Sequence, residues 1–276
     1  MSWTVVGAGR LGAALCAWLT EAGLPPQALV SRRRPRALGR RFRIPALALE
    51  AWQASLAVLP PGNIILAVPD DALAALARHL ASARPDWRGW CVMHTSGARA
   101  SAVLASLRRR GAAVASLHPM MTFPKGRGGS SPAGVVFSLE GDAKACREAQ
   151  ALVRRWRGLL LRLSPKSKAT YHLAATLVGP GAVVTMAAAQ SLLRASGLRG
   201  EQLARASAGL RTLLAATAAN LAGGAAAAWT GPWARGDAET FHLHLRLLHS
   251  PELQRLYLAL AEAGAELLPG SRSVQN

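Results

Sequence analysis

Three glycines near the amino end of the chain have the spacing of a dinucleotide-binding turn. The segment Thr4–Gly12 reads T-V-V-G-A-G-R-L-G, a short β-branched run joined to a G-x-G-x-x-G pattern. In such a turn Gly7 allows a tight passage from strand to helix, Gly9 lets a pyrophosphate approach the backbone, and Gly12 lets the helix pack on the strand. The Ala- and Leu-rich residues 13–22 predict a helix whose first N–H groups face the phosphates, although the glycines could also serve a purely structural turn. The predicted cofactor residues of this turn are Gly7, Gly9, Arg10, Leu11 and Gly12.

The next predicted strand, Ala28–Ser31, ends where NAD-specific folds carry an acidic residue on the ribose. Here the acid is missing, and Ser31 is followed by Arg32, Arg33 and Arg34. A hydroxyl and guanidinium groups suit a 2′-phosphate, which they bind through charge-assisted, bidentate hydrogen bonds. Ser31, Arg32 and Arg33 therefore predict NADP(H) as the cofactor. The alternative is a solvated basic loop in an arginine-rich protein.

A third predicted strand reads N-I-I-L-A-V-P over Asn63–Pro69, a continuous apolar run of the parallel-strand type. Its carboxyl end borders the ligand crevice in a doubly wound sheet, so Ala67, Val68 and Pro69 are predicted to line the cofactor. Asp70 and Asp71 follow at the start of a predicted helix, where we expect them to act as N-terminal caps.

Two further predicted strands, Trp90–Met93 and Ala112–Leu117, each lead directly into a histidine. Parallel strands share one polarity, so both histidines are expected at the same rim as the glycine turn. Histidine suits proton transfer near neutral pH, and hydroxyls can orient a carbonyl or a water molecule. The alternative is that each histidine only satisfies loop carbonyls. The predicted catalytic residues of these segments are His118 and Ser96, and the predicted substrate contacts are His94 and Thr95.

Lys168 and His172 stand four residues apart, so a helix places them on one face. A lysine can protonate or polarise a carbonyl oxygen when its surroundings keep its pKa suited to the task. Lysine is scarce, because only four of the 33 lysines and arginines are lysine. We predict Lys168 and His172 as catalytic residues. The alternative is an ordinary cation beside a domain junction.

A turn into a new helix is predicted at Thr230–Asp237, where Thr230 or Asp237 is available as a cap. Arg235 in this turn could clamp a substrate carboxylate, although a capping or ion-pair role fits it equally. His242 and His244 are two apart on a helix and do not face one way. The cysteine and histidine spacings predict no metal site.

The pattern of elements predicts an α/β domain followed by an all-α domain. Strand candidates at 135–139 and 159–163 flank an amphipathic helix at 143–156, and only helical periodicity follows residue 165. We therefore expect an NADP-binding Rossmann domain with a doubly wound, mostly parallel sheet at 1–164, and a helical domain at 165–276. Residues 126–133 are rich in Gly and Ser and predict a flexible loop that could close over the site.

Composition excludes a disordered chain, because 51% of the 276 residues are hydrophobic. The net charge of +19 comes mostly from arginine, and no nucleic-acid-binding signature accompanies it, so we expect no specific nucleic-acid partner. The apolar stretches 173–193 and 213–229 are expected to be buried bundle helices and not membrane spans. The expected strand at the amino end leaves no room for a signal peptide, and three scattered cysteines fit a reducing compartment, so we expect a cytoplasmic protein.

Six motifs together resemble a known group. They are V-G-A-G-R-L-G, I-L-A-V-P-D-D, H-T-S-G, H-P-M-M-T-F, K-A-T-Y-H and T-G-P-W-A-R-G-D, and they span nearly the whole chain. The chain resembles the bacterial Rossmann-like proteins whose C-terminal half is a helical domain of unknown function, within the 6-phosphogluconate-dehydrogenase-like superfamily that also holds ketopantoate reductase. The resemblance implies a two-domain NADP-dependent oxidoreductase that is often a homodimer through its helical domain. It also implies that the helix carrying Lys168 faces the nicotinamide.

One departure bears on the substrate. Members of the group carry an Asn shortly after the K-x-x-Y-H stretch, whereas residues 177–181 here read L-V-G-P-G. The function expected is hydride transfer to or from a small carbonyl or imine, with a 2-oxo acid of the ketopantoate type as the first candidate. The alternatives are a prephenate-dehydrogenase-like enzyme and a non-catalytic NADP-binding sensor.

Overall fold

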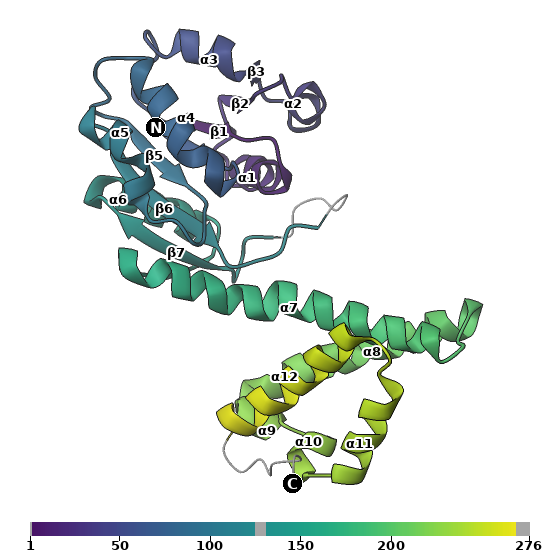
Figure 1. Cartoon of the computed structure of the whole chain (residues 1–276). Helices are drawn as coiled ribbons and strands as arrows, with labels where there is room; N and C mark the ends of the chain where they lie inside the picture. The colour runs from purple at the N-terminus through teal and green to yellow at the C-terminus, as the bar shows by residue number, and fades with distance from the viewer. Residues whose placement is uncertain (1, 125–130, 269–276) are drawn as a thin grey trace. The chain divides into compact units, whose positions relative to one another are not determined.

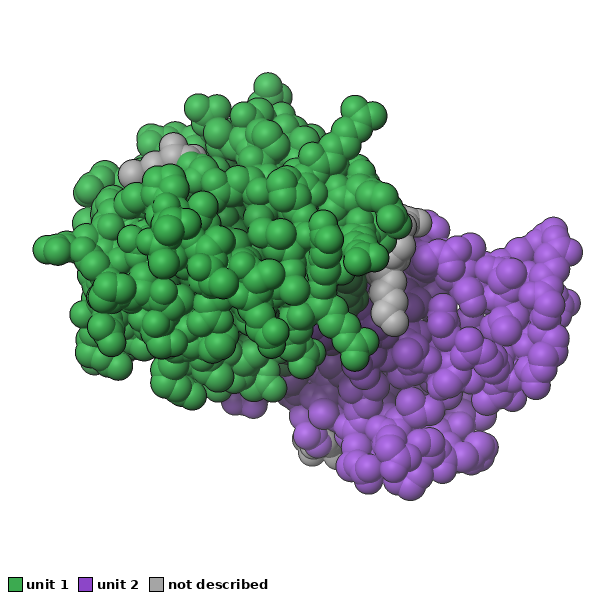
Figure 2. Space-filling model, turned by 90° about the horizontal axis from the view of Figure 1, so that it is seen from above, with its two compact units in different colours: residues 1–179 green, residues 180–276 purple. Residues whose placement is uncertain are grey.

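The computed structural model describes residues 2–124 and 131–268. The chain forms two compact units, Met1–Gly179 and Pro180–Asn276, which Figure 2 colours separately. The boundary between the units, after Gly179, falls inside the long helix α7, Lys168–Ala195. The last strand of the first unit ends earlier, at Arg162. Residues 126–130 of the predicted loop at 126–133 lie outside the described residues.

The first unit is built on one eight-stranded sheet with the order β3-β2-β1-β4-β5-β6-β7-β8 (Figure 1). Strands β1 to β6 are parallel, β7 pairs with β6 in the antiparallel sense, and β8 runs parallel to β7. This sheet confirms the predicted Rossmann-type fold class. The strands are β1 Trp3–Val6, β2 Ala28–Ser31, β3 Ala46–Ala48, β4 Asn63–Leu66, β5 Cys91–His94, β6 Ala113–Pro119, β7 Val136–Gly141 and β8 Leu159–Arg162.

Helices cover both faces of this sheet and bury two apolar clusters. On one face, Trp18 of α1 lies edge-on to Trp156, which follows α6, with ring centroids 5.4 Å apart. On the other face, Leu73, Ala77 and Leu80 of α4 pack against β1, β4 and β5. The helices of this unit are α1 Arg10–Glu21, α2 Arg36–Phe42, α3 Leu49–Ser55, α4 Asp70–Ser82, α5 Ala105–Arg109, α6 Ala143–Arg155 and the first turns of α7 Lys168–Ala195.

Two local expectations are wrong. The strand β6 runs on to Pro119, so His118 lies inside the strand and not after it. The helix α4 has Pro69 as its N-cap, and no side chain caps it. Asp70 and Asp71 instead form its first turn, where their negative charges interact favourably with the positive end of the helix dipole. The Asp70 carboxylate also accepts a hydrogen bond from the Ser96 hydroxyl at 2.7 Å. The short elements β3, α2 and α3 were not anticipated from the sequence.

The second unit is helical and has a small hydrophobic core. Phe241 and Ala261 are buried against Trp233 and Tyr257, and Gly264 leaves room for the ring of Trp229. The predicted cap is confirmed, because the Asp237 carboxylate accepts from the backbone of Thr240 at the start of α11. The helices after α7 are α8 Gly200–Asn220, α9 Ala225–Ala228, α10 Pro232–Arg235, α11 Ala238–Leu247 and α12 Pro251–Leu267.

The two apolar stretches expected to be buried are exposed in this single chain. The segment Pro165–Ala195 is long and apolar enough by composition to cross a membrane. No residue in its most apolar stretch of 18 residues is buried. Leu177 and Val178 are 70% and 75% exposed, and Leu213 of α8 is 63% exposed. Large exposed apolar surfaces often mark interaction sites.

Candidate functional site

The glycine turn has the geometry that a phosphate cradle needs. Gly7 is buried with φ of 119°, and a Cβ there would collide with the carbonyl of Ala67, while a Cβ on Gly12 would collide with the carbonyl of Gly7. Only glycine fits these two positions. Gly9 is exposed with open space around it, and no side chain caps the helix that begins at Arg10. The first N–H groups of α1 are thus open to an anionic ligand.

The other predicted cofactor residues lie at the carboxyl ends of the neighbouring strands. In the order β2-β1-β4, Ser31 ends β2 and is half-buried, and Arg32 and Arg33 follow it with exposed side chains. Arg34 is committed elsewhere, because its Nε donates to the carbonyl of Ala46 at 2.8 Å. The remaining predicted residues are Arg10 and Pro69, which are exposed, and Leu11, Ala67 and Val68, which are half-buried.

Strands β5, β6 and β7 carry a group of polar side chains on one face of the sheet. His94, Ser116 and Glu140 form one row across the three strands, and His118 and Ser138 form the next row. Register partners share a face, and residues two apart along a strand do as well. Four of the five are buried, and His118 is half-buried. The sheet therefore supports a polar layer at this place.

The first turns of α7 complete the layer within the same unit. Lys168 is fully buried, and its Nζ donates to the hydroxyl of Ser116 at 2.7 Å. The rings of Tyr171 and His172 stand 5.8 and 5.5 Å from the ring of His118, both nearly perpendicular to it. Spacings of three and four residues put these side chains on one helix face. The structure thus brings together His94, His118, Lys168 and His172, four residues singled out from the sequence.

Burial and the lysine charge set the protonation of this layer. Burial lowers the pKa of Lys168 to about 8, and the charges of Glu140 and Asp70 oppose that shift. Burial, followed by the nearby Lys168 charge, lowers the pKa of His94 and of His118 to about 4. Near pH 7 the site therefore holds an ammonium beside two neutral imidazoles.

Several buried polar atoms in the layer have no hydrogen-bond partner within the described residues. They include Nδ1 of His118 and Nδ1 of His172. Buried polar groups in native proteins are nearly always paired with protein, water or ligand. Two imidazole nitrogens beside the buried ammonium therefore lack a hydrogen-bond partner within the described residues, and Nδ1 of His172 lies close to Gly97.

The loop after β5 and the predicted Arg235 behave differently. The hydroxyl of Ser96 donates to Asp70, and the hydroxyl of Thr95 donates to the carbonyl of Leu66 at 3.3 Å, so both are engaged by the protein. Arg235 belongs to the second unit, where its side chain is exposed and 3.8 Å from Asp237. Among the described residues no group of three metal-ligating side chains occurs.

Sequence reasoning missed three participants, namely Ser116, Glu140 and Tyr171. A signal for the first existed, because Ser116 and His118 are polar at alternate positions of an apolar strand, which marks one face. Glu140 could not be found in this way. Its place beside Ser116 depends on the antiparallel pairing of β7 with β6.

Comparisons with known proteins agree with this architecture. A family model described as a Rossmann-like domain matches residues 1–119, and one described as a domain of unknown function, DUF2520, matches residues 135–263. The chain thus combines a Rossmann-like domain with a DUF2520 domain. This confirms the classification expected from the sequence, and no curated protein matches this DUF2520 protein.

Solved structures share the fold of this DUF2520 protein. A candidate NADP oxidoreductase from Bacteroides fragilis is 22% identical with a TM-score of 0.79, covering 96% of this chain and 98% of its own. A protein from Thermotoga maritima is 21% identical with a TM-score of 0.68, covering 96% and 97%. A reductive aminase from Aspergillus terreus, in complex with NADPH and ethyl-5-oxohexanoate, is 17% identical with a TM-score of 0.72, covering 99% and 96%. At these identities the likeness establishes the fold.

Gly97 tests how tightly the imidazole pair is held. A Cβ on Gly97 would collide with Nδ1 of His172 and lie 2.9 Å from Nε2 of His118. We expect Gly97→Ala to destabilise the protein by about 1–3 kcal/mol, since overpacking must displace the rings. Urea unfolding measures the loss. Gly209→Ala is the control, because open space surrounds Gly209 within α8, and equal effects of the two substitutions would contradict this geometry.

Proposed function

We propose that this DUF2520 protein is an NADP(H)-dependent oxidoreductase that transfers hydride to or from a small carbonyl or imine. The observation that carries the proposal is the buried Lys168 ammonium, set beside unpartnered imidazoles on strands next to the glycine turn. The fold shared with a candidate NADP oxidoreductase and with a reductive aminase supports it.

The glycine turn fits the pyrophosphate of the cofactor. Gly9 is open to solvent, and the N-terminus of α1 has free N–H groups for the phosphates. We expect Ser31, Arg32 and Arg33, at the end of the adjacent strand β2, to bind the 2′-phosphate. When bound, NADPH supplies the hydride.

Lys168 is the proposed proton donor. An ammonium has three protons, and the bond to Ser116 uses one of them, which leaves others for a substrate oxygen or nitrogen. A pKa of about 8 keeps the group charged near neutral pH yet able to release a proton. His118 and His172, whose rings lie beside the Lys168 ammonium, are proposed to help orient the substrate. Ser96 keeps His94 in place, because its N–H donates to Nδ1 of that ring.

The substrate class follows from this donor. A cation aimed at a polar double bond suits a ketone or an imine, and the reductive aminase of the same fold holds a keto ester with NADPH. A 2-oxo acid of the ketopantoate type stays the first candidate among carbonyl compounds. Prephenate-type oxidation and a non-catalytic sensor are the alternatives that turnover assays separate.

We further propose a homodimer formed through the helical domain. Exposed apolar side chains occur on α7, among them Val178 and Val183, and on α8, among them Leu213. A second copy of the chain would bury them, and the start of α7 is held in the first unit by the Lys168–Ser116 hydrogen bond. The protein is accordingly proposed to be cytoplasmic.

The arginines after β2 should decide cofactor choice. We expect Arg32→Ala and Arg33→Ala each to weaken NADPH binding about tenfold or more, because each removes a charge-assisted bond to the 2′-phosphate. NADH binding should not change. Isothermal titration calorimetry measures both, with Arg36→Ala, also exposed, as the matched control. Equal affinity of the wild-type protein for NADPH and NADH would refute the cofactor assignment.

Lys168 should be required for turnover. With NADPH and a panel of 2-oxo acids, ketones and imines, Lys168→Met is expected to lower kcat/KM at least about 100-fold without weakening NADPH binding. The wild-type rate of reduction should fall as the pH rises above about 8, where the ammonium loses its proton. Lys166→Met is the control, since Lys166 is exposed two residues away. Cofactor binding without turnover of any panel member would favour the sensor.

The apolar face of α7 should control the oligomeric state. We expect Val178→Glu to convert a dimer into a monomer, because it places a charge in the proposed interface. Light scattering coupled to size-exclusion chromatography measures the mass. Val58→Glu is the control, since Val58 is 85% exposed elsewhere on the first unit. A monomeric wild-type protein at micromolar concentration would contradict the proposal.

A further inference from the structure

Among the Asp, Glu, Lys and Arg residues in the described part of the chain, only Lys168 and Glu140 are buried. They lie on either side of one residue. Ser116 accepts from the Lys168 ammonium and is the register partner of Glu140 across β6 and β7. Within the described residues, Lys168 and Glu140 form no ion pair with a nitrogen–oxygen distance of 4.0 Å or less. The two opposite charges therefore share a buried layer without direct contact.

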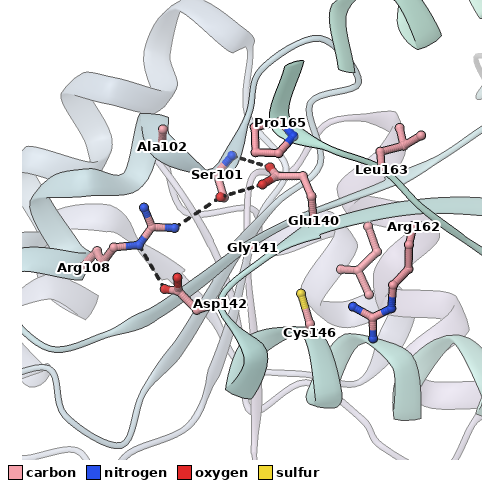
Figure 3. Close-up of a pocket in the computed structure, with 11 residues that line it drawn as sticks. Ser101, Ala102, Arg108, Glu140, Gly141, Asp142, Cys146, Arg162, Leu163 and Pro165 are labelled. Carbon is pink, nitrogen blue, oxygen red and sulfur yellow. Dashed lines mark hydrogen bonds and ion pairs between the residues drawn. The ribbon is translucent and has the colours of Figure 1, made fainter. Parts of the chain in front are cut away.

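The Glu140 carboxylate is firmly held. One of its oxygens accepts from the backbone N–H of Ser101, and the other accepts from the Ser101 hydroxyl at 2.9 Å. Arg108 in turn donates to the Ser101 hydroxyl at 3.3 Å and pairs with Asp142 at 3.0 Å (Figure 3). The carboxylate borders a cavity of about 460 Å³. Two donors from one residue fix its position.

Other charged or titratable groups face Lys168 less effectively. Asp70, from the start of α4, is exposed, so solvent and salt screen its charge. His94 of β5 and His118 of β6 have pKa values lowered to about 4 by burial and are neutral near pH 7. Tyr171 and His172 lie on α7 itself, and burial raises the pKa of Tyr171. This leaves Glu140 as the buried charge able to act across a short, weakly screening path.

We propose that Glu140 is a positioning residue that keeps Lys168 in its ammonium form through the buried layer around Ser116. Burial alone drives a lysine toward its neutral form, which could not donate a proton to a substrate. The Glu140 charge opposes this. The electrostatic part of the proposal stands on the structure, and its consequence for catalysis rests on the proposed function.

The four lysines of the chain make a direct measurement practical. In protein labelled with ¹³C at lysine Cε, the signal missing from Lys168→Arg identifies Lys168, and its NMR titration in the wild-type protein should have a midpoint near pH 8. Glu140→Gln keeps an oxygen for the Ser101 N–H but removes the charge. We expect it to lower the midpoint by about one pH unit.

Asp142→Asn is the matched control, because it removes the same charge two residues along the chain, from a carboxylate engaged by Arg108. It should leave the midpoint unchanged. An unshifted midpoint in folded Glu140→Gln overturns the proposal, as does an equal shift in both variants. If Glu140→Gln does not fold, the wild-type protein decides. Raising the salt from about 0.1 M to about 1 M should hardly move the midpoint, and a marked fall would assign the effect to exposed Asp70.

The pH profile of turnover links the two proposals and separates their failures. If Lys168 donates the proton, the alkaline limb of kcat/KM should move to lower pH in Glu140→Gln by the same amount as the NMR midpoint. A shifted midpoint without turnover of any substrate supports the role of Glu140 while the proposed reaction fails. Turnover with an unshifted midpoint overturns the role of Glu140 alone.

Discussion

The burial of the Lys168 ammonium is the constraint on which the site depends. Burying a lysine ammonium costs free energy unless hydrogen bonds and an opposite charge compensate for the lost hydration. Ser116 supplies the hydrogen bond at 2.7 Å, and Glu140 supplies the nearest buried negative charge. Both requirements are met only where α7 begins against β6 and β7. The start of the long helix is therefore tied to the sheet by the same interaction that forms the proposed proton donor.

The reversal of strand direction at β7 makes this arrangement possible. Because β7 is antiparallel to β6, its carboxyl end lies beside the middle of β6, and Glu140 comes next to Ser116. A parallel β7 would have brought different residues to this row. The helix α5 on this face is short, with five residues, which leaves the carboxyl half of β5 and β6 free for a polar layer and for α7.

The cofactor turn and the polar layer depend on the same sheet but on different physics. Steric fit determines the turn, because no side chain is tolerated at Gly7 or Gly12. Electrostatics determines the layer, because burial holds His118 neutral beside a charged Lys168. In the order β2-β1-β4-β5-β6-β7 the glycine turn follows β1, and the polar layer lies on β5, β6 and β7.

Local pattern determined much of this protein. The glycine spacing, the apolar strands, the arginines after Ser31 and the spacing of Lys168 and His172 are properties of short segments, so the fold class and most candidate residues could be predicted from sequence. The tertiary structure alone decided four further points. It placed His118 inside β6, it engaged the hydroxyls of Ser96 and Thr95 with the protein, and it left the apolar faces of α7 and α8 exposed. It also brought Glu140 beside Ser116, because strand pairing between residues 24 positions apart follows from the packing of the whole sheet and not from any local pattern.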